Sequence, residues 1–192
     1  LLIATIIFGI LVDKNNFRRL YKLLFQLFLA LTLITLFNFK LFQNVFPLIK
    51  IDFIFLFLNI FFIVAFINFI NFIDGSDGNL VLFVFFVIFC LISRLYLNLS
   101  IDQYNFLIYL FPFLISFYFF NINKKIFLGD SGSLFLSIFL IFNLDYFISN
   151  EVIFIADVMI ISSYFVTDMI ITFFLRFYNY GFNSFKAHRD HA

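Results

Sequence analysis

Residues 53–72 read FIFLFLNIFFIVAFINFINF, an apolar run in which three asparagines are the only polar residues. The run contains no charge and matches the roughly 20 residues that a helix needs to cross about 30 Å of hydrocarbon. It lacks the alternation of apolar and polar residues that the strands of a membrane barrel require. The run therefore predicts a transmembrane helix.

The rest of the chain has the same character. Of its 192 residues, 65% are hydrophobic and 12% are charged, and the mean hydropathy is +1.12. So little polar surface cannot cover a soluble globule of this size. We therefore expect an all-α, polytopic helical membrane protein, with a single membrane-embedded domain over 1–192. The expected spans are 1–12, 20–37, 53–72, 80–97, 104–120, 132–148 and 152–176.

The ends and the overall charge add three expectations. Leu1 lies inside an apolar run and Ala192 directly follows a charged stretch, so we expect a longer parent chain that is truncated at both ends. The net charge is +1 and the cations are scattered, which argues against a nucleic acid partner. Cys90 is the single cysteine and cannot form an internal disulfide.

The seven spans place the connecting segments alternately on two sides of the membrane, here named side A and side B. The cations of side A are Lys14, Arg18, Arg19, Lys22, Lys124, Lys125, Arg176, Lys186 and Arg189. The cations of side B are Lys40, Lys50 and Arg94. Because cytoplasmic loops are enriched in lysine and arginine, side A is predicted to be cytoplasmic.

Four polar clusters fall on side A. They are Asp13, the segment 68–77, Asp130 and the segment 188–191. Polar groups near membrane depth are costly unless they are used or paired. We therefore expect these clusters to form one site on the cytoplasmic face.

The first cluster is NFINFIDGSDG, residues 68–78. Asn68 and Asn71 are three residues apart on one helix face, and Asp74 and Asp77 continue that spacing into a turn. Their oxygens could bind a hard cation such as Mg²⁺ and the polar edges of a substrate. The alternative is a helix end capped by Asn and Asp.

The second cluster is FLGDSGSLFL, residues 127–136. Asp130 or Ser131 could cap the helix that begins here, leaving free backbone N–H groups that attract phosphate. A carboxylate beside phosphate calls for a bridging Mg²⁺. A plain helix cap is the alternative. Lys124 and Lys125 could attract an anionic headgroup or serve as topology anchors, and we favour anchors.

The remaining polar residues are less specific. In FKAHRDHA, residues 185–192, Arg189 suits a phosphate and His191 could move a proton, although a solvated loop is equally consistent. The histidine pair has no partners for a zinc site. Asp13 alone is typical of a surface charge or cap. Asp157 and Asp168 are expected to face the bundle, either in structural pairs or near the site.

Taken together, these residues resemble the polyprenyl-phosphate N-acetylhexosamine-1-phosphate transferases (glycosyltransferase family 4, the MraY/WecA/WbpL-like enzymes). The family's Asn-x-x-Asn-x-x-Asp-Gly-x-Asp-Gly signature matches Asn68, Asn71, Asp74, Gly75, Asp77 and Gly78. Its Gly-Asp-x-Gly-Ser signature matches Gly129, Asp130, Gly132 and Ser133. AHRDHA resembles the Ala-His-Arg-x-His that closes the O-antigen-initiating branch, and DMIITFFLRFYNYG resembles the segment before it.

The resemblance implies a Mg²⁺-dependent transfer of a HexNAc-1-phosphate from a UDP-sugar to undecaprenyl (polyprenyl) phosphate, with release of UMP. It implies that Asn71 and Asp130 hold Mg²⁺. The implied catalytic residues are Asp13, Asp74, Asp77 and His191. The implied substrate-binding residues are Asn68, Ser133, His188 and Arg189. The expected partners are a UDP-N-acetylhexosamine, a polyprenyl phosphate lipid and the bacterial inner membrane, and a homodimer is left open.

One position departs from the family pattern. The family carries two adjacent aspartates where this chain has Val12 and Asp13. If the first acid is the essential base, Val12→Asp in the full-length protein is expected to raise turnover.

Two other classes of protein compete with the transferase. An ion-coupled transporter would place acids near the midplane of the membrane and show an internal repeat, and neither is visible in the sequence. A nonenzymatic membrane scaffold or decayed gene product is the other alternative, and Val12 and the expected truncation at both ends favour it.

Overall fold

The computed structural model describes residues 1–15, 19–45, 51–74, 78–97, 105–123, 125–126, 128–150 and scattered positions between 153 and 178. The chain divides into two compact units, Leu1–Ile155 and Ala156–Ala192. Each unit is described by itself below.

The described part of the first unit consists of helices and contains no strand. The helices are α1 (Leu2–Asn15), α2 (Arg19–Leu36), α3 (Leu41–Val45), α4 (Asp52–Asp74), α5 (Asn79–Leu97), α6 (Asn105–Ile122) and α7 (Gly129–Ser149). The prediction of an all-α fold is confirmed for these residues, and each of the first six predicted spans corresponds to one long helix. The short helix α3 was not predicted.

The second unit coincides with most of the predicted span 152–176. Its described positions between 156 and 178 are helical, and several of them expose large apolar side chains. Asp157 is half-buried there, whereas Asp168 lies outside the described residues. The prediction that one domain comprises both units stays a prediction.

Two described helices, α4 and α7, are long and apolar enough to cross a membrane. Shorter apolar helical stretches cover Leu20–Leu36, Asn79–Ser93 and Phe111–Ile122. Length and composition thus support two of the seven predicted spans directly.

Helix α4 has two different faces. Phe53, Phe57 and Phe61 follow one another at intervals of four residues and are exposed. Asn59 lies on the opposite face and is fully buried. Its Oδ1 accepts a hydrogen bond from the backbone N–H of Phe42 at 3.3 Å, and its Nδ2 donates to Gln43 Oε1 at 2.8 Å. This buried amide is therefore satisfied by α3 and fixes that short helix against α4.

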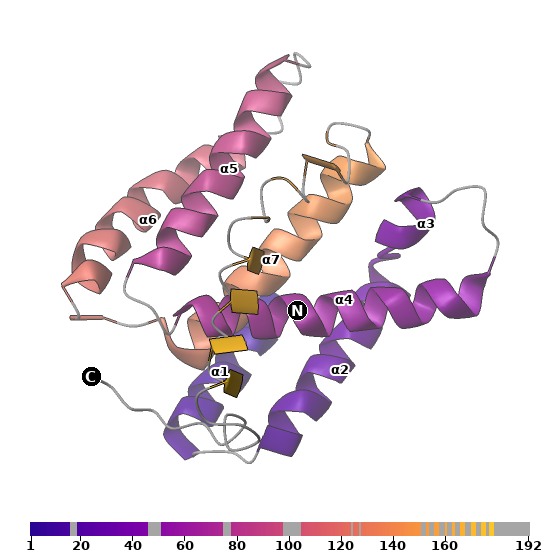
Figure 1. The fold of residues 1–192 in the computed structure, drawn as a ribbon, viewed down its shortest axis with the longest axis horizontal. Helices are drawn as coiled ribbons and strands as arrows, with labels where there is room; N and C mark the ends of the chain where they lie inside the picture. Colours follow the sequence, from indigo (N-terminus) through magenta and orange to yellow (C-terminus); the bar gives the residue numbers. More distant parts are fainter. Residues whose placement is uncertain are drawn as a thin grey trace. The chain divides into compact units, whose positions relative to one another are not determined.

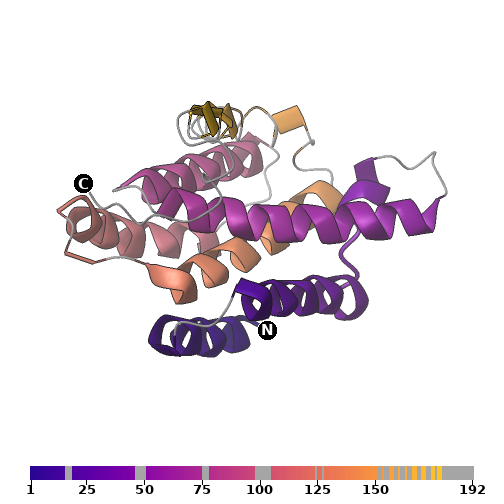
Figure 2. The ribbon, with the colours of Figure 1, turned by 60° about the horizontal axis from the view of Figure 1, so that its bottom comes forward.

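Helix α7 is the centre of the first unit, because it packs against both α1 and α4, while α2 packs against α4 (Figure 1). Figure 2 shows α1 and α2 on the same side of α4 and α7. The rings of Phe8 on α1 and Phe25 on α2 stack with centroids 3.6 Å apart. This packing brings the end of α1 to the beginning of α7.

Helices α1 and α7 come very close to each other at Gly9. A Cβ atom built on Gly9 would lie 2.1 Å from the Cα of Ser131, which is closer than real side chains come to a backbone atom. A residue without a side chain is therefore required for this crossing.

We predict that Gly9→Val lowers the thermal unfolding temperature by several degrees, because overpacking costs about 1–3 kcal/mol. Ala4→Val, at an exposed position of the same helix, is the matched control and should have little effect. Melting followed by circular dichroism in detergent measures both. Equal melting temperatures for the two variants would contradict the close packing of α1 on α7.

Candidate active site

The beginning of α7 is capped by a side chain from another helix. The residue before the helix, Leu128, makes no side-chain cap hydrogen bond. Instead, the backbone N–H of Asp130 donates to Oδ1 of Asp13 at 3.1 Å, and that of Ser131 donates to Oδ2 at 3.4 Å. The expectation that Asp130 or Ser131 caps this helix is therefore wrong, because both lie inside its first turn.

Gly129 makes room for this contact. Its φ is +66°, in the left-handed region that favours glycine. A Cβ at this position would lie 3.0 Å from Oδ2 of Asp13. The glycine of the second motif thus allows the Asp13 carboxylate to reach the helix end.

Asp74 approaches the same helix end from the C-terminus of α4. It is half-buried, and the backbone N–H groups of Gly129 and Leu128 act as hydrogen-bond donors to its carboxylate. The charges of Asp130 and Asp13 also act on it. Three carboxylates from three helices therefore surround the N-terminus of α7, where the helix dipole favours negative charge.

The positive charge of Lys22 balances part of this cluster. Lys22 extends from α2, and its ammonium forms an ion pair with Oδ2 of Asp130. The side chains are 33% and 16% exposed, so the pair is partly shielded from water. The sequence predicted Lys22 only as a topology-determining cation, and its partner is 108 positions away in the chain.

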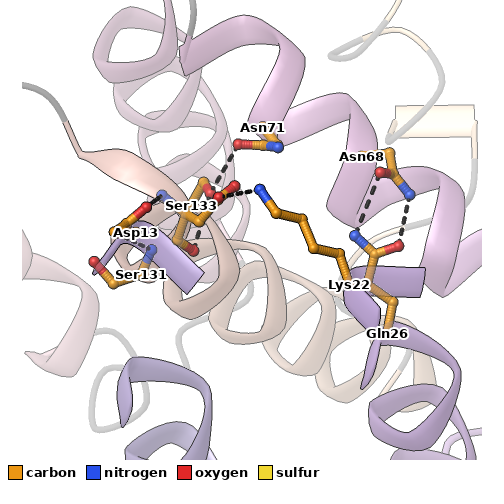
Figure 3. Close-up of polar contacts among 8 residues, drawn as sticks. Asp13, Lys22, Gln26, Asn68, Asn71, Ser131 and Ser133 are labelled. Carbon is orange, nitrogen blue, oxygen red and sulfur yellow. Dashed lines mark hydrogen bonds and ion pairs between the residues drawn. The ribbon is translucent and has the colours of Figure 1, made fainter. Parts of the chain in front are cut away.

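Asn71 and Asp130, the predicted metal ligands, lie near each other through Ser133. Ser133 is buried, and its Oγ is 3.2 Å from Oδ1 of Asn71 and 3.3 Å from the carbonyl oxygen of Asp130. In Figure 3 the side chains of Asn71 and Lys22 both point toward Ser133. The structure thus brings residues of both motifs together.

Asn68 has a different partner. Its amide exchanges two hydrogen bonds with the amide of Gln26, at 2.9 and 3.3 Å (Figure 3). Its Nδ2 also donates to the backbone carbonyl of Val64 at 2.8 Å. Here Asn68 joins α4 to α2, and its predicted role in substrate binding stays a prediction.

A second connecting amide, Asn121, was missed by the sequence reasoning. It lies in the last turn of α6 and is buried, with 3% exposure. Its Oδ1 accepts from the backbone N–H of Gly78 at 2.7 Å, and its Nδ2 donates to the carbonyl of Ile126 at 2.9 Å. It therefore ties the end of the first motif to the segment before the second. A lone amide inside an apolar run is the signal that could have revealed Gln26, whereas Asn121 stands among other polar residues in NINKK and carries no such signal.

The remaining predicted site residues are not placed. Asp77, His188, Arg189 and His191 lie outside the described residues. Val12, at the position of the missing family aspartate, is buried with 2% exposure.

Asn71 and Asp130 are the residues that the sequence assigns to a magnesium ion. Within the part of the chain that the structure describes, no group of three His, Cys, Asp or Glu side chains could hold a metal. Mg²⁺, however, usually binds through one or two carboxylates together with waters and substrate phosphates. Asp130 could supply such a carboxylate and Asn71 an amide oxygen, and Asp130 is paired here with the ammonium of Lys22. Their role as metal ligands stays a prediction.

These observations define a class of protein: the described residues form helices, and an acidic cluster surrounds the N-terminus of one of them. The family model described as "Glycosyl transferase family 4" matches residues 1–148. This chain belongs to glycosyl transferase family 4, a family of phospho-sugar transferases. Neither a curated protein nor a solved structure gives a significant match.

We predict that Asp13→Ala destabilises the protein by about 0.5–2 kcal/mol, the usual cost of losing a helix cap. Thermal unfolding in detergent measures this loss. Asp52→Ala removes an exposed acid in the first turn of α4 and is the control for loss of charge near a helix start. A melting temperature for Asp13→Ala equal to that of Asp52→Ala would argue against capping by Asp13.

We also predict that Asn121→Ala costs more than Asn123→Ala. The first change leaves the buried N–H of Gly78 without its partner, at about 1–3 kcal/mol. Asn123 is exposed and bonds only the carbonyl of Phe119 in the preceding turn among the described contacts. Chemical unfolding of both variants distinguishes them, and equal midpoints would refute the connecting role of Asn121.

Proposed function

We propose that this chain transfers a HexNAc-1-phosphate from a UDP-sugar to undecaprenyl or another polyprenyl phosphate, releasing UMP. The observation that carries the proposal is the convergence of Asp13, Asp74 and Asp130 on the start of α7, beside Asn71 and Ser133. Membership of a phospho-sugar transferase family supports the same reaction class. The product would initiate synthesis of a cell-envelope polysaccharide such as O-antigen.

The proposed reaction exchanges one phosphoanhydride bond for another and leaves the ester bond between the sugar and its phosphate intact. An oxygen of the lipid phosphate attacks the phosphorus that bears the sugar. The new P–O bond forms while the bond from that phosphorus to the bridging oxygen of UMP breaks, and UMP leaves. Asn71 and Asp130 would hold Mg²⁺, which when bound offsets the charge of the diphosphate.

The protein's own groups would position the two reactants. Asp74, at the end of α4, is the described acid closest in the chain to the first motif's turn and would face the nucleotide and lipid-phosphate cleft. Asp13 fixes the start of α7, so that Asp130 is held beside Asn71. Holding a lipid and a soluble nucleotide in one geometry supplies a large share of catalysis in such transfers.

The exposed apolar surface supports a membrane location. Phe53, Phe57 and Phe61 form an exposed row on α4 in the described part of the chain, and a soluble protein rarely exposes such a surface. Lipid chains would cover these rings. The charge asymmetry of the loops supports a cytoplasmic site in a polytopic protein of the bacterial inner membrane. A homodimer stays a prediction.

The test is release of UMP from UDP-GlcNAc by the full-length protein in lipid nanodiscs that contain undecaprenyl phosphate. We expect UMP release that requires both the lipid phosphate and Mg²⁺ and that stops on addition of EDTA. Asp130→Asn should lower the rate by about 100-fold or more, because the Mg²⁺ that would offset the charge of the diphosphate loses a carboxylate ligand. The exposed Asp52→Asn is the control and should retain activity.

A folded protein that releases no UMP from any UDP-N-acetylhexosamine would refute the transferase. Lipid-independent movement of ions across vesicles that contain the protein would favour the transporter instead.

A further inference from the structure

The ion pair between Lys22 and Asp130 occupies an oxygen that the proposed function assigns to a metal. We propose that Lys22 keeps the metal site closed in the absence of substrate: its ammonium and a divalent cation compete for the carboxylate of Asp130. This inference rests on the proposed function only in taking Asp130 as a metal ligand.

The position of the ammonium supports direct competition. Lys22 contacts Oδ2 of Asp130, and the Asp130 side chain is only 16% exposed, so few other approaches to that carboxylate are open. Asn71, the second proposed ligand, points toward the same place, where its Oδ1 contacts Ser133 (Figure 3). A metal ion bound by Asp130 would therefore compete with the Lys22 ammonium for the same carboxylate.

The negative charge of the three carboxylates at the start of α7 has to be compensated by a nearby cation. Asp13, Asp74 and Asp130 interact with one another around the start of α7. Among the described residues, Lys22 is the basic residue that forms an ion pair with this cluster. Because uncompensated charges in a partly buried site are costly, loss of this ammonium leaves acids that attract another cation. A divalent ion is the natural replacement.

The backbone of α2 holds Lys22 where its ammonium can either pair with Asp130 or be displaced by a metal ion. Gln26 follows Lys22 by one helical turn, and its amide is joined to Asn68 of α4 by two hydrogen bonds. The root of the Lys22 side chain is thereby anchored, while its four-carbon stem can move. The amide pair is thus a positioning device that returns the ammonium to Asp130 when the metal leaves.

The test measures the binding of Mn²⁺ to the full-length protein without nucleotide. Electron paramagnetic resonance detects the Mn²⁺ that remains free. We expect Lys22→Met to bind Mn²⁺ at least about tenfold more tightly than the wild type, because the apparent dissociation constant falls when a competing state is removed. Lys14→Met removes an equal charge at an exposed position and should bind within about twofold of the wild type. Lys22→Arg keeps the competing charge and should also remain close to the wild type.

A second measurement uses the wild-type chain and needs no variant. Saturating Mg²⁺ should increase acylation of Lys22 several-fold, as read by mass spectrometry, because the displaced side chain becomes more accessible. Acylation of Lys14 should not change. Constant labelling of Lys22 would overturn the proposal even if Lys22→Met failed to fold.

The outcomes separate this inference from the proposed function. Equal Mn²⁺ affinity of Lys22→Met and Lys14→Met, with Mg²⁺-dependent UMP release intact, overturns the competition alone. Tight Mn²⁺ binding that persists in the double variant Lys22→Met/Asp130→Asn also overturns the competition, because the ion would then bind elsewhere. Absence of both metal binding and UMP release from every folded protein overturns the inference and the transferase together.

Discussion

The first turn of α7 imposes the main constraint on the structure. The first backbone N–H groups of any helix lack partners within the helix, and in an apolar protein few waters are available to satisfy them. Here the acceptors come from other helices, because Asp13 lies in the last turn of α1 and Asp74 ends α4. The ends of three helices must therefore meet at one point. Gly9 and Gly129 permit that meeting, since a side chain at either would collide with it.

This solution creates an electrostatic problem that α2 resolves. Carboxylates that cap a helix gain from its dipole, but Asp13, Asp74 and Asp130 repel one another. The ammonium of Lys22 reduces this repulsion, and the amide pair between Gln26 and Asn68 holds it in place. The contact of α2 with α4 thus places a positive charge beside the negatively charged N-terminus of α7.

The sequence predicted the helices well, because an apolar run of membrane length has few other ways to satisfy its backbone. It also predicted that Asn71 and Asp130 would share a site, since counting spans places both motifs on one side. The short helix α3 escaped prediction because it depends on the buried amide of Asn59, which lies beyond it in the chain. The cap by Asp13 and the pairing of Lys22 escaped for the same reason. Both join residues more than one hundred positions apart, and local spacing carries no sign of them.

The cap also explains what the substitution at Val12 does to the fold. Consecutive residues on a helix point about 100° apart, so positions 12 and 13 cannot both face the start of α7. Asp13 faces it, and Val12 is buried on another side of α1. An aspartate at position 12 would lose its hydration without gaining the N–H donors that Asp13 uses. Replacement of the first family aspartate by valine therefore leaves the cap intact and removes a buried charge. Replacement of the second would leave the backbone N–H groups of Asp130 and Ser131 without their acceptor, which is a structural reason for an aspartate at position 13.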